Sequence, residues 1–198
     1  AHQKLDVIDL NIDFLAGSGH KLCGPTGIGF LWSRKEILEK IPPLFGGGEM
    51  IQDVFEETST WAELPHKFEA GTPAIAEAIG LAEAINYINN IGLNEIHEYE
   101  KTITRYLFEK LNQIENIEII GPSPEIDPDR ASLATFYIKN IHSNDIAEIL
   151  DSKGICIRSG HHCCQPLHRY IGINSTARIS MNFTTNKEEI DIFIEKLK

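Results

Sequence analysis

The chain has 198 residues, with 42% hydrophobic and 8% aromatic side chains, a composition typical of a globular protein with one or two domains. No apolar run approaches the ~20 residues that a membrane-spanning helix needs, which argues against a membrane protein. The formal net charge of -11 argues against a nucleic-acid partner, because no stripe of Lys and Arg is present to neutralise phosphates.

The N-terminal segment, AHQKLDVIDL, has the build of neither a signal peptide nor a transit peptide, which favours a cytoplasmic location. The four cysteines show no disulfide spacing, and adjacent cysteines rarely bridge because the ring that they would close is strained. Reduced thiols fit the same compartment. The cysteines are Cys23, Cys156, Cys163 and Cys164.

The first predicted elements are a strand, a glycine-rich loop and a second strand. Ile12 to Ala16 predicts a buried strand, and Ile28 to Trp32 predicts the next one. Between them, GSGHKLCGPTGIG places Lys21 in a nest of glycines, which would let the backbone approach a ligand, with Ser18 and His20 beside the lysine. A lone loop lysine is usually just solvated. This cluster of donors, however, suits an anion such as a phosphate together with an amine nucleophile.

A short helix over Ser33 to Ile41, stopped by two prolines, precedes a polar and irregular segment that ends at Lys67. This segment is longer than a connector needs to be, which is typical of a loop with a function or an interface. The sequence FEAGTP then predicts a helix start, with Thr72 as N-cap and Pro73 in the first turn. The apolar residues that continue this helix at helical spacing are Ile75, Ile79, Ala82, Ile85 and Ile88.

Asn90 to Leu93 interrupts the apolar pattern and predicts a hinge, which places a domain boundary near residue 90. A second long helix follows, and its apolar stripe is Ile96, Tyr99, Ile103, Tyr106, Leu107, Leu111 and Ile114. The later predicted elements are strands at 117–120, 132–138, 155–158 and 177–181, a helix at 144–153, and a terminal helix from Asn186 with Thr185 and Glu188 as a capping box. This alternation predicts an α/β fold with domains 1–90 and 91–198.

The loop RSGHHCCQPLH, residues 158–168, gathers several candidate ligands and nucleophiles. Consecutive side chains point in different directions and the usual zinc spacings are absent, so we do not expect a metal site. Cysteines acting as small buried hydrophobes, with structural histidines, are one alternative. The interpretation that we favour is a nucleophilic thiol, because two histidines and Arg158 near an exposed cysteine favour its thiolate form.

Arg178 lies in the apolar strand ARISM, which is an unusual place for a charged side chain. A planar guanidinium in such a position commonly forks onto a carboxylate. The carboxylate could belong to a substrate or to a structural Asp or Glu, and the residues alone leave both possibilities open.

Five motifs, in this order along nearly the whole chain, resemble the SUF-type (group II) cysteine desulfurases and the related selenocysteine lyases. The motifs are SGHK at 18–21, GPTGIG at 24–29, GGG-x-MI at 46–51, FEAGTP at 68–73 and R-x-GHHC at 158–163. The resemblance implies a pyridoxal-phosphate enzyme of the aspartate aminotransferase fold. The chain would form the C-terminal part of the large domain and a small α/β domain, and the enzyme would convert L-cysteine to L-alanine.

The resemblance also assigns roles around the cofactor, pyridoxal 5'-phosphate. Lys21 matches the lysine that binds the cofactor covalently, and His20 and Ser18 match ligands of its phosphate. Gly71 and Thr72 match a segment that reaches the phosphate in the partner subunit's site, which implies a homodimer.

On the substrate side, Cys163 matches the cysteine that becomes a persulfide, while Cys164 stands where the family often has alanine and is expected to be a spectator. Arg178 matches the arginine that grips the substrate carboxylate, and Arg158 flanks the same pocket. The persulfide sulfur would pass to an acceptor protein of the SUF system for iron–sulfur cluster assembly.

The chain begins about halfway through the family's pattern, so the aromatic residue that stacks on the cofactor ring, the aspartate that pairs with the ring nitrogen and the first phosphate-binding loop are missing. We therefore expect this polypeptide alone to bind pyridoxal phosphate poorly and to lack desulfurase activity. Two alternatives stay open. A selenocysteine lyase would differ in its preference between cysteine and selenocysteine, and a non-catalytic persulfide relay would be insensitive to Lys21→Ala.

Overall fold

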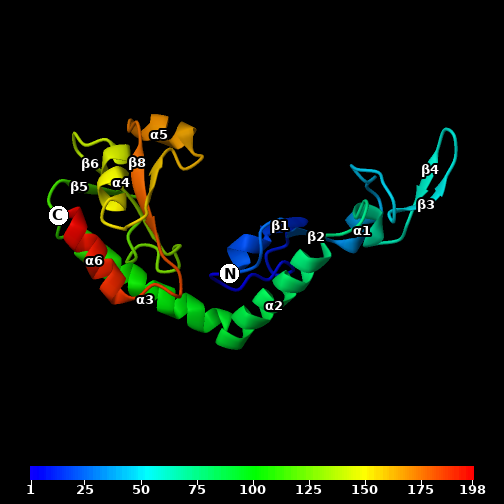
Figure 1. Cartoon of the computed structure of the whole chain (residues 1–198), viewed down its shortest axis with the longest axis horizontal. Coiled ribbons are helices and arrows are strands. Elements are labelled where there is room, and N and C mark those ends of the chain that lie inside the picture. Colours follow the sequence, from blue (N-terminus) through cyan, green and yellow to red (C-terminus); the bar gives the residue numbers. More distant parts are fainter. The chain divides into compact units, whose positions relative to one another are not determined.

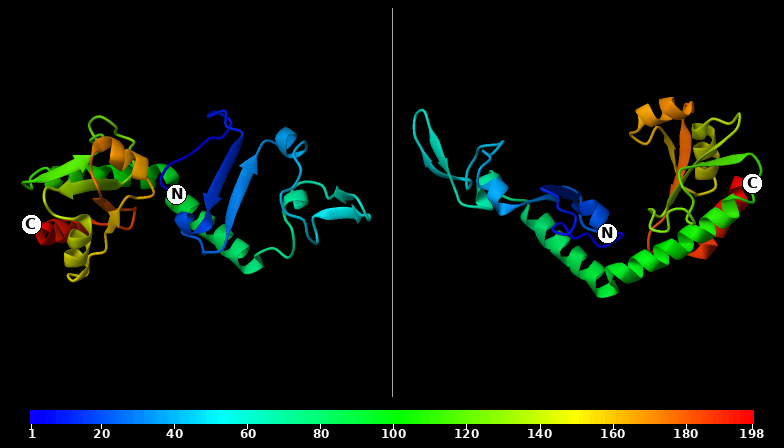
Figure 2. Two further views of the ribbon diagram at one scale, coloured as in Figure 1. Left: turned by 90° about the horizontal axis from the view of Figure 1, so that it is seen from above. Right: turned by 180° about the vertical axis from the view of Figure 1, so that it is seen from behind.

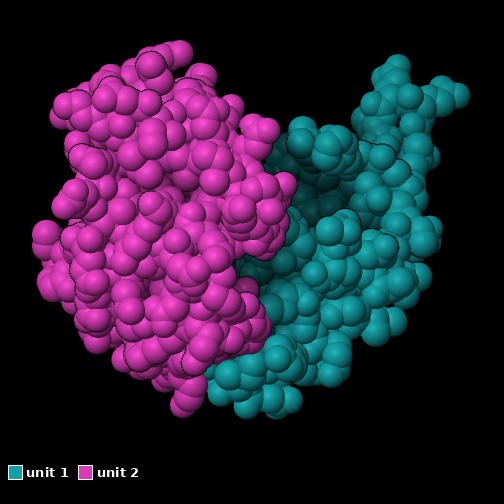
Figure 3. Space-filling model, turned by 60° about the vertical axis from the view of Figure 1, so that its left-hand side comes forward, with its two compact units in different colours: residues 1, 3–93 teal, residues 2, 94–198 magenta.

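The computed structural model of the protein describes residues 1 to 198, and the chain divides into two compact units. Unit 1 contains Ala1 and Gln3–Leu93, and unit 2 contains His2 and Asn94–Lys198 (Figure 3). Gly92, which lies in the predicted hinge, has a φ of 100° and separates the two long helices. None of the helices combines the length and the apolar content that crossing a membrane requires.

Unit 1 is built from two hairpins, one long helix and several short ones. In chain order these are β1 (Phe14–Ser18), η1 (Gly19–Leu22), β2 (Gly29–Ser33), α1 (Lys35–Leu38), β3 (Ile51–Val54), β4 (Ser59–Trp61), η2 (His66–Phe68) and α2 (Ile75–Ile91). β1 pairs antiparallel with β2 along its whole length, from Phe14 opposite Ser33 to Ser18 opposite Gly29. The prediction of a buried strand here is wrong, because β1 has β2 as its single neighbour and its residues are exposed or half-buried.

A hairpin that the sequence did not predict occupies the long segment before Lys67. β3 and β4 pair antiparallel, and the Phe55 N–H donates to the Thr58 carbonyl at 2.8 Å to close the turn. The hairpin projects away from the rest of unit 1 (Figures 1 and 2). Its strands read IQDV and STW, so a polar composition without clear apolar alternation concealed it.

The long helix of unit 1 starts later and buries a different face than the sequence predicted. Thr72 does not cap it: Gly71, with a φ of 81°, donates its N–H to the Gly48 carbonyl at 2.8 Å, and α2 begins only after Ala74. The buried residues are Leu81, Ala84 and Ile88. Of the predicted stripe, Ile88 is thus confirmed, whereas Ile75, Ile79 and Ile85 are exposed. α2 is apolar on several sides, so spacing alone could not select its buried face.

Unit 2 is a four-stranded antiparallel sheet with helices. Its elements are α3 (Leu93–Leu111), β5 (Ile117–Ile120), β6 (Leu133–Ile138), α4 (Ser143–Asp151), β7 (Arg158–Gly160), α5 (Gln165–Ile171), β8 (Thr176–Ser180) and α6 (Lys187–Leu197). The strand order is β5-β6-β8-β7, and every neighbouring pair is antiparallel. The predicted mixture of helices and strands is therefore confirmed, and the strand at 117–120 matches β5 in both bounds.

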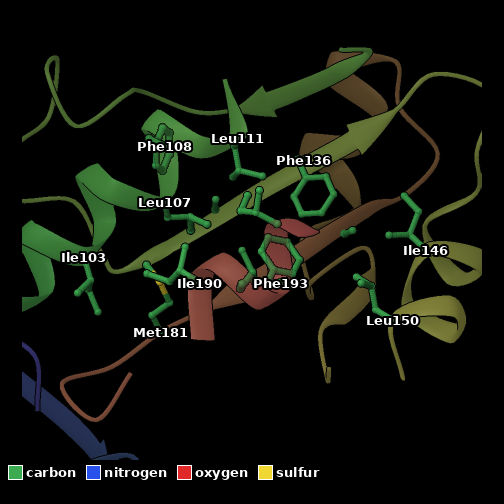
Figure 4. Packing of buried hydrophobic residues seen from close by; sticks show 14 residues of the cluster. Ile103, Leu107, Phe108, Leu111, Phe136, Ile146, Leu150, Met181, Ile190 and Phe193 are labelled. Carbon is green, nitrogen blue, oxygen red and sulfur yellow. The ribbon is translucent and has the colours of Figure 1, made fainter. Parts of the chain in front are cut away.

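One face of this sheet forms the core of unit 2. The register places Phe136 opposite Ala177 and Ala134 opposite Ile179, and all four side chains are buried. Helices α3, α4 and α6 pack against them, and the rings of Phe136 and Phe193 lie 6.4 Å apart (Figure 4). The helical side chains of the cluster are Ile103, Leu107, Phe108, Leu111, Ile146, Leu150, Ile190, Phe193 and Ile194.

Helices α3 and α6 run side by side in unit 2 (Figures 1 and 2). The Tyr106 hydroxyl donates to Asp191 at 2.7 Å, and Lys110 pairs with the same carboxylate at 3.0 Å. These contacts tie the polar edges of the two helices together above their apolar faces.

Two predictions in unit 2 are wrong by small shifts. The strand predicted at 155–158 lies at Arg158–Gly160, because Ile155 and Ile157 pack against the core instead of pairing in the sheet. The capping box of α6 is formed by Asn186 and Glu189 rather than by Thr185 and Glu188. Asn186 and Glu189 exchange two backbone-to-side-chain hydrogen bonds of 2.9 Å each.

Candidate functional site

The sheet face of unit 2 that points away from the core carries two arginines directly opposite each other. Arg158 on β7 pairs in register with Arg178 on β8. Side chains alternate along a strand, so the burial of Ala177 and Ile179 in the core turns Arg178 to the other face. This explains why an apolar strand contains an arginine. Like charges directly opposite repel each other, which makes the pair a place where an anion would be stabilised.

No carboxylate of the chain pairs with either arginine, since all the ion pairs of the structure involve other residues. The Nε atom of Arg178 is buried and lacks a hydrogen-bond partner. Of the two possibilities that the sequence left open for Arg178, a structural Asp or Glu is therefore not supported within this chain. A guanidinium with an unused N–H donor suits a carboxylate from outside the chain.

Cys163 lies next to Arg158. Its thiol is exposed, and an Nη2 hydrogen of Arg158 points to its Sγ at 3.4 Å. His162 and Cys163 both occupy the left-handed region, with φ values of 52° and 61°, and the Cys164 N–H donates to the His161 carbonyl at 2.8 Å to close the turn. Such backbone strain in residues with a Cβ concentrates at functional sites.

The Cys163 loop, residues 161–164 between β7 and α5, lines an open pocket and leads into a short helix. Cys164 stands at the N-cap of α5, its side chain makes no capping bond, and Gly172 ends the helix in the left-handed conformation. The pocket is lined by Arg158, Ser159, His161, His162, Cys163, Gln165 and Pro166. This arrangement leaves the Cys163 thiol accessible to a ligand on the arginine-bearing side.

His162 belongs to the same loop, and its ring contacts β8. Its Nε2 is 3.0 Å from the hydroxyl of Thr176, which belongs to the same sheet face as Arg178. Burial lowers the pKa of His162, and the charges of Arg178 and Arg158 lower it further, while a backbone hydrogen bond at Thr176 acts in the opposite direction. The lowered pKa favours the neutral imidazole.

The second group of predicted site residues lies in unit 1, at the end of β1. Ser18 is the last residue of the strand, and His20 and Lys21 follow in η1, both exposed. The side chains of these three residues make no hydrogen bond or ion pair in the structure. A hydroxyl, an imidazole and an amine on one turn fit the anchoring of a phosphate and the covalent capture of an aldehyde. These residue types thus fit the anchoring end of pyridoxal phosphate.

The glycines around Lys21 have a packing reason that differs from the predicted approach of a ligand. A Cβ on Gly17 would lie 2.5 Å from the Phe30 ring, and one on Gly24 would lie 2.9 Å from the Gly19 carbonyl. Because these glycines lack side chains, the β1–β2 hairpin and the η1 turn can close tightly. The turn that carries Lys21 is therefore held in place by hairpin packing.

Two further motifs meet in unit 1. The bond between Gly71 and Gly48 joins FEAGTP to the triple-glycine segment, and a Cβ on Gly47 would approach Ala70 to 3.3 Å. Thr72 is exposed and makes no side-chain hydrogen bond. These two residues of the predicted cofactor site, Gly71 and Thr72, thus lie in a defined turn that precedes α2.

The structure brings together Arg158, Cys163 and Arg178 in unit 2, and Ser18, His20 and Lys21 in unit 1. Sequence reasoning missed Thr176 and His168, both buried polar residues that support the Cys163 loop. The alternation in TARIS, which puts Thr176 and Arg178 on one face, was a signal that could have found Thr176. No group of three or more His, Cys, Asp or Glu side chains in the chain is arranged to hold a metal ion.

Comparison with known proteins places the chain in a family. The aminotransferase class-V pattern matches residues 1–193. Probable cysteine desulfurases from Synechocystis sp. and Staphylococcus epidermidis are 52% and 48% identical to the chain over 197 residues. Each match covers 100% of this chain and 47% of the relative, so the chain spans about half the length of the curated relatives that it matches.

Solved structures agree. The cysteine desulfurase CsdA from Escherichia coli matches with a TM-score of 0.91 and 33% identity, over 99% of this chain and 48% of that one. The apo cysteine desulfurase from Thermococcus onnurineus NA1 matches with a TM-score of 0.92 and 39% identity, over 98% and 48%. The chain therefore belongs to the aminotransferase class-V family, in which it groups with cysteine desulfurases over about half of their length.

Proposed function

We propose that the protein acts as a pyridoxal-phosphate-dependent cysteine desulfurase of the SUF type, which converts L-cysteine to L-alanine and takes the sulfur as a persulfide on Cys163. The observation that carries the proposal is the exposed Cys163 thiol, 3.4 Å from the guanidinium of Arg158, whose partner across the strands, Arg178, forms no ion pair with a carboxylate of the chain. The fold is then the C-terminal part of an aspartate aminotransferase-like large domain followed by a small domain. The contacts to the cofactor ring fall to the half of the family's fold that this chain does not span.

Unit 1 would hold the cofactor. Lys21 would bind it covalently, and His20 and Ser18 would bind its phosphate, because all three side chains are free of other partners. Gly71 and Thr72 would reach the phosphate of a partner subunit in a homodimer. Pyridoxal phosphate, when bound, supplies an electron sink for bonds at the Cα of an amino acid. The Lys21 amine would then move the Cα proton of the substrate.

Unit 2 would bind the substrate carboxylate and accept the substrate sulfur. Arg178 would hold the substrate carboxylate, and Arg158 would stabilise the Cys163 thiolate. The thiolate attacks the substrate sulfur, so that an S–S bond forms and the C–S bond breaks. The electron pair of the C–S bond remains with the carbon, which takes up a proton and becomes the methyl group of alanine. An acceptor protein would then remove the persulfide sulfur for iron–sulfur cluster assembly.

The covalent role of Lys21 can be tested by trapping. The chain, completed with the N-terminal half of the Synechocystis relative, is incubated with pyridoxal phosphate, reduced with borohydride and mapped by mass spectrometry. We expect the pyridoxyl group on Lys21, and its loss in Lys21→Arg but not in Lys35→Arg, which alters another exposed lysine, on α1. Equal labelling of both lysines would contradict the assignment. Without the added N-terminal half, the chain should incorporate little of the pyridoxyl group.

The fate of the sulfur tests the rest of the proposal. After incubation with L-cysteine, we expect a persulfide on Cys163 of the completed protein, together with alanine. Cys163→Ser should abolish both products, and Cys164→Ala should abolish neither. A persulfide that forms equally well in Lys21→Ala would support the non-catalytic relay and contradict the desulfurase. Alanine from selenocysteine with none from cysteine would identify the selenocysteine lyase instead.

A further inference from the structure

A buried chain of hydrogen bonds lies beneath the Cys163 loop. The hydroxyl of Thr176 is 3.0 Å from Nε2 of His162 and 3.0 Å from Nε2 of His168, and Nδ1 of His168 is 3.0 Å from the Cys164 carbonyl oxygen. Thr176 is fully buried and His168 is 5% exposed. Because water is excluded from the Thr176 hydroxyl, the two rings are its hydrogen-bond partners.

The direction of every bond in this chain is determined by one end. The Cys164 carbonyl can only accept, so Nδ1 of His168 carries a proton. With a single proton on the His168 ring, its Nε2 is then an acceptor and takes the single hydroxyl hydrogen of Thr176. The Thr176 oxygen must accept from the other ring, so Nε2 of His162 carries a proton. The Cys164 carbonyl thus sets the tautomer of His162 through His168 and Thr176.

The remaining nitrogen of His162 has no partner. Its Nδ1 is buried, and the tautomer derived above makes it an unprotonated acceptor. Burial and the nearby charges of Arg178 and Arg158 keep the pKa of His162 below its usual value, so the ring stays neutral instead of collecting the thiol proton. His162 is thereby suited to holding the conformation of the turn that carries Cys163. The arginines are suited to stabilising the Cys163 thiolate.

His162 and Cys163 are consecutive and share the left-handed turn, whose strained φ values require an anchor. The bond from His162 to Thr176 is that anchor, and it holds the turn that presents Sγ to Arg158. We propose that Thr176 and His168 are positioning residues for Cys163, which act by fixing the tautomer and orientation of His162. The proposal deepens the proposed function and rests on it for the role of Cys163 as sulfur acceptor.

The tautomers can be observed directly in the full chain labelled with ¹⁵N. Two-bond ¹H–¹⁵N spectra distinguish a protonated ring nitrogen from an unprotonated one. We expect His162 to carry its proton on Nε2 and His168 to carry its proton on Nδ1 at pH 7. In Thr176→Val the ring-nitrogen signals of His162 should shift to those of a mixture of the two tautomers, as we expect for the exposed His161. The opposite tautomer in either ring of the parent chain would overturn the proposal.

Thiol reactivity tests the consequence for Cys163. Iodoacetamide labelling, followed by mass spectrometry in a Cys164→Ala background, gives the rate at Cys163 relative to Cys156, an exposed thiol of the same unit beside Asp151. We expect this ratio to fall about fivefold in Thr176→Val, the factor that corresponds to one net hydrogen bond of about 1 kcal/mol. Thr176→Ser keeps the hydroxyl and should retain the parent ratio.

Two further variants separate positioning from stability. Thr104→Val removes an equally buried hydroxyl on α3, which bonds Glu100 and Ser132, and should leave the ratio unchanged although the unit is destabilised. His168→Asn can still donate to the Cys164 carbonyl but cannot reach Thr176, and it should match Thr176→Val. A parent-like ratio in His168→Asn, or an equal fall in Thr104→Val, would overturn the proposal. Correct tautomers in the chain, together with no persulfide on Cys163 of the completed protein, would refute the proposed function alone.

Discussion

Replacing Phe136 with alanine tests how much the core of unit 2 contributes to its stability. Phe136 is fully buried on the inner strand β6, and its ring lies 6.4 Å from that of Phe193 on α6. Truncation of such a phenylalanine costs about 3–5 kcal/mol, of which roughly 0.5–1.5 kcal/mol belongs to the ring pair. Domains of this size are stable by about 5–15 kcal/mol, so unit 2 should lose a large share of its free energy of unfolding.

Urea unfolding followed by far-UV circular dichroism and tyrosine fluorescence measures this loss. Both tryptophans, Trp32 and Trp61, lie in unit 1, so tryptophan fluorescence does not report on unit 2. Phe136→Leu keeps most of the apolar volume and should cost about 1 kcal/mol or slightly more, from the lost ring pair. Ile126→Ala, at a side chain that is 78% exposed, should change stability by less than about 0.5 kcal/mol. The reasoning fails if Phe136→Ala stays within about 1 kcal/mol of the parent.

Three further predictions concern the ends of elements and the site. Asn186→Ala should lower the free energy of unfolding by about 1 kcal/mol and Thr185→Ala by less, and the reverse order in urea titrations would reject the observed cap. Arg158→Gln should slow the alkylation of Cys163 at pH 7, and an unchanged rate would exclude a guanidinium effect. Because the folded-state pKa of His162 lies below its usual 6.5, the unfolded chain binds more protons, and stability should fall as pH drops below about 6.5. This fall should be smaller in His162→Gln, and an identical slope in that variant would contradict the assignment.

The helices show when an apolar pattern suffices to predict a structure. In α3, polar residues occupy one side. Of the predicted stripe, Ile96, Ile103, Leu107 and Leu111 are buried, while Tyr99 is exposed. In α2, apolar residues occupy several sides, so the choice of the buried face depended on what the rest of unit 1 offered for packing. The β3–β4 hairpin was missed for the opposite reason, since its polar strands have no apolar face to reveal them.

The candidate site divides in the same way. Lys21, Cys163 and Arg178 could be selected from the sequence because a lysine among glycines, a cysteine beside histidines and an arginine in an apolar strand are each unusual in their local context. Their roles in sulfur transfer remain predictions. The alternation in TARIS places Thr176 on the face of Arg178, but no local pattern indicates that His168 contacts it, since that contact joins a helix to a strand.

The sequence by itself determined the family, the residue types that the chemistry needs and the order of the motifs, because these are properties of local stretches of chain. Only the tertiary structure decided that Arg158 faces Arg178 without a carboxylate, that Arg158 points to the Cys163 thiol, and that a buried threonine joins two histidines beneath it. The physical reason is strand register. A shift of β8 by one residue against both of its neighbours would turn Arg178 and Thr176 toward the core, and that register is set by packing across the whole sheet.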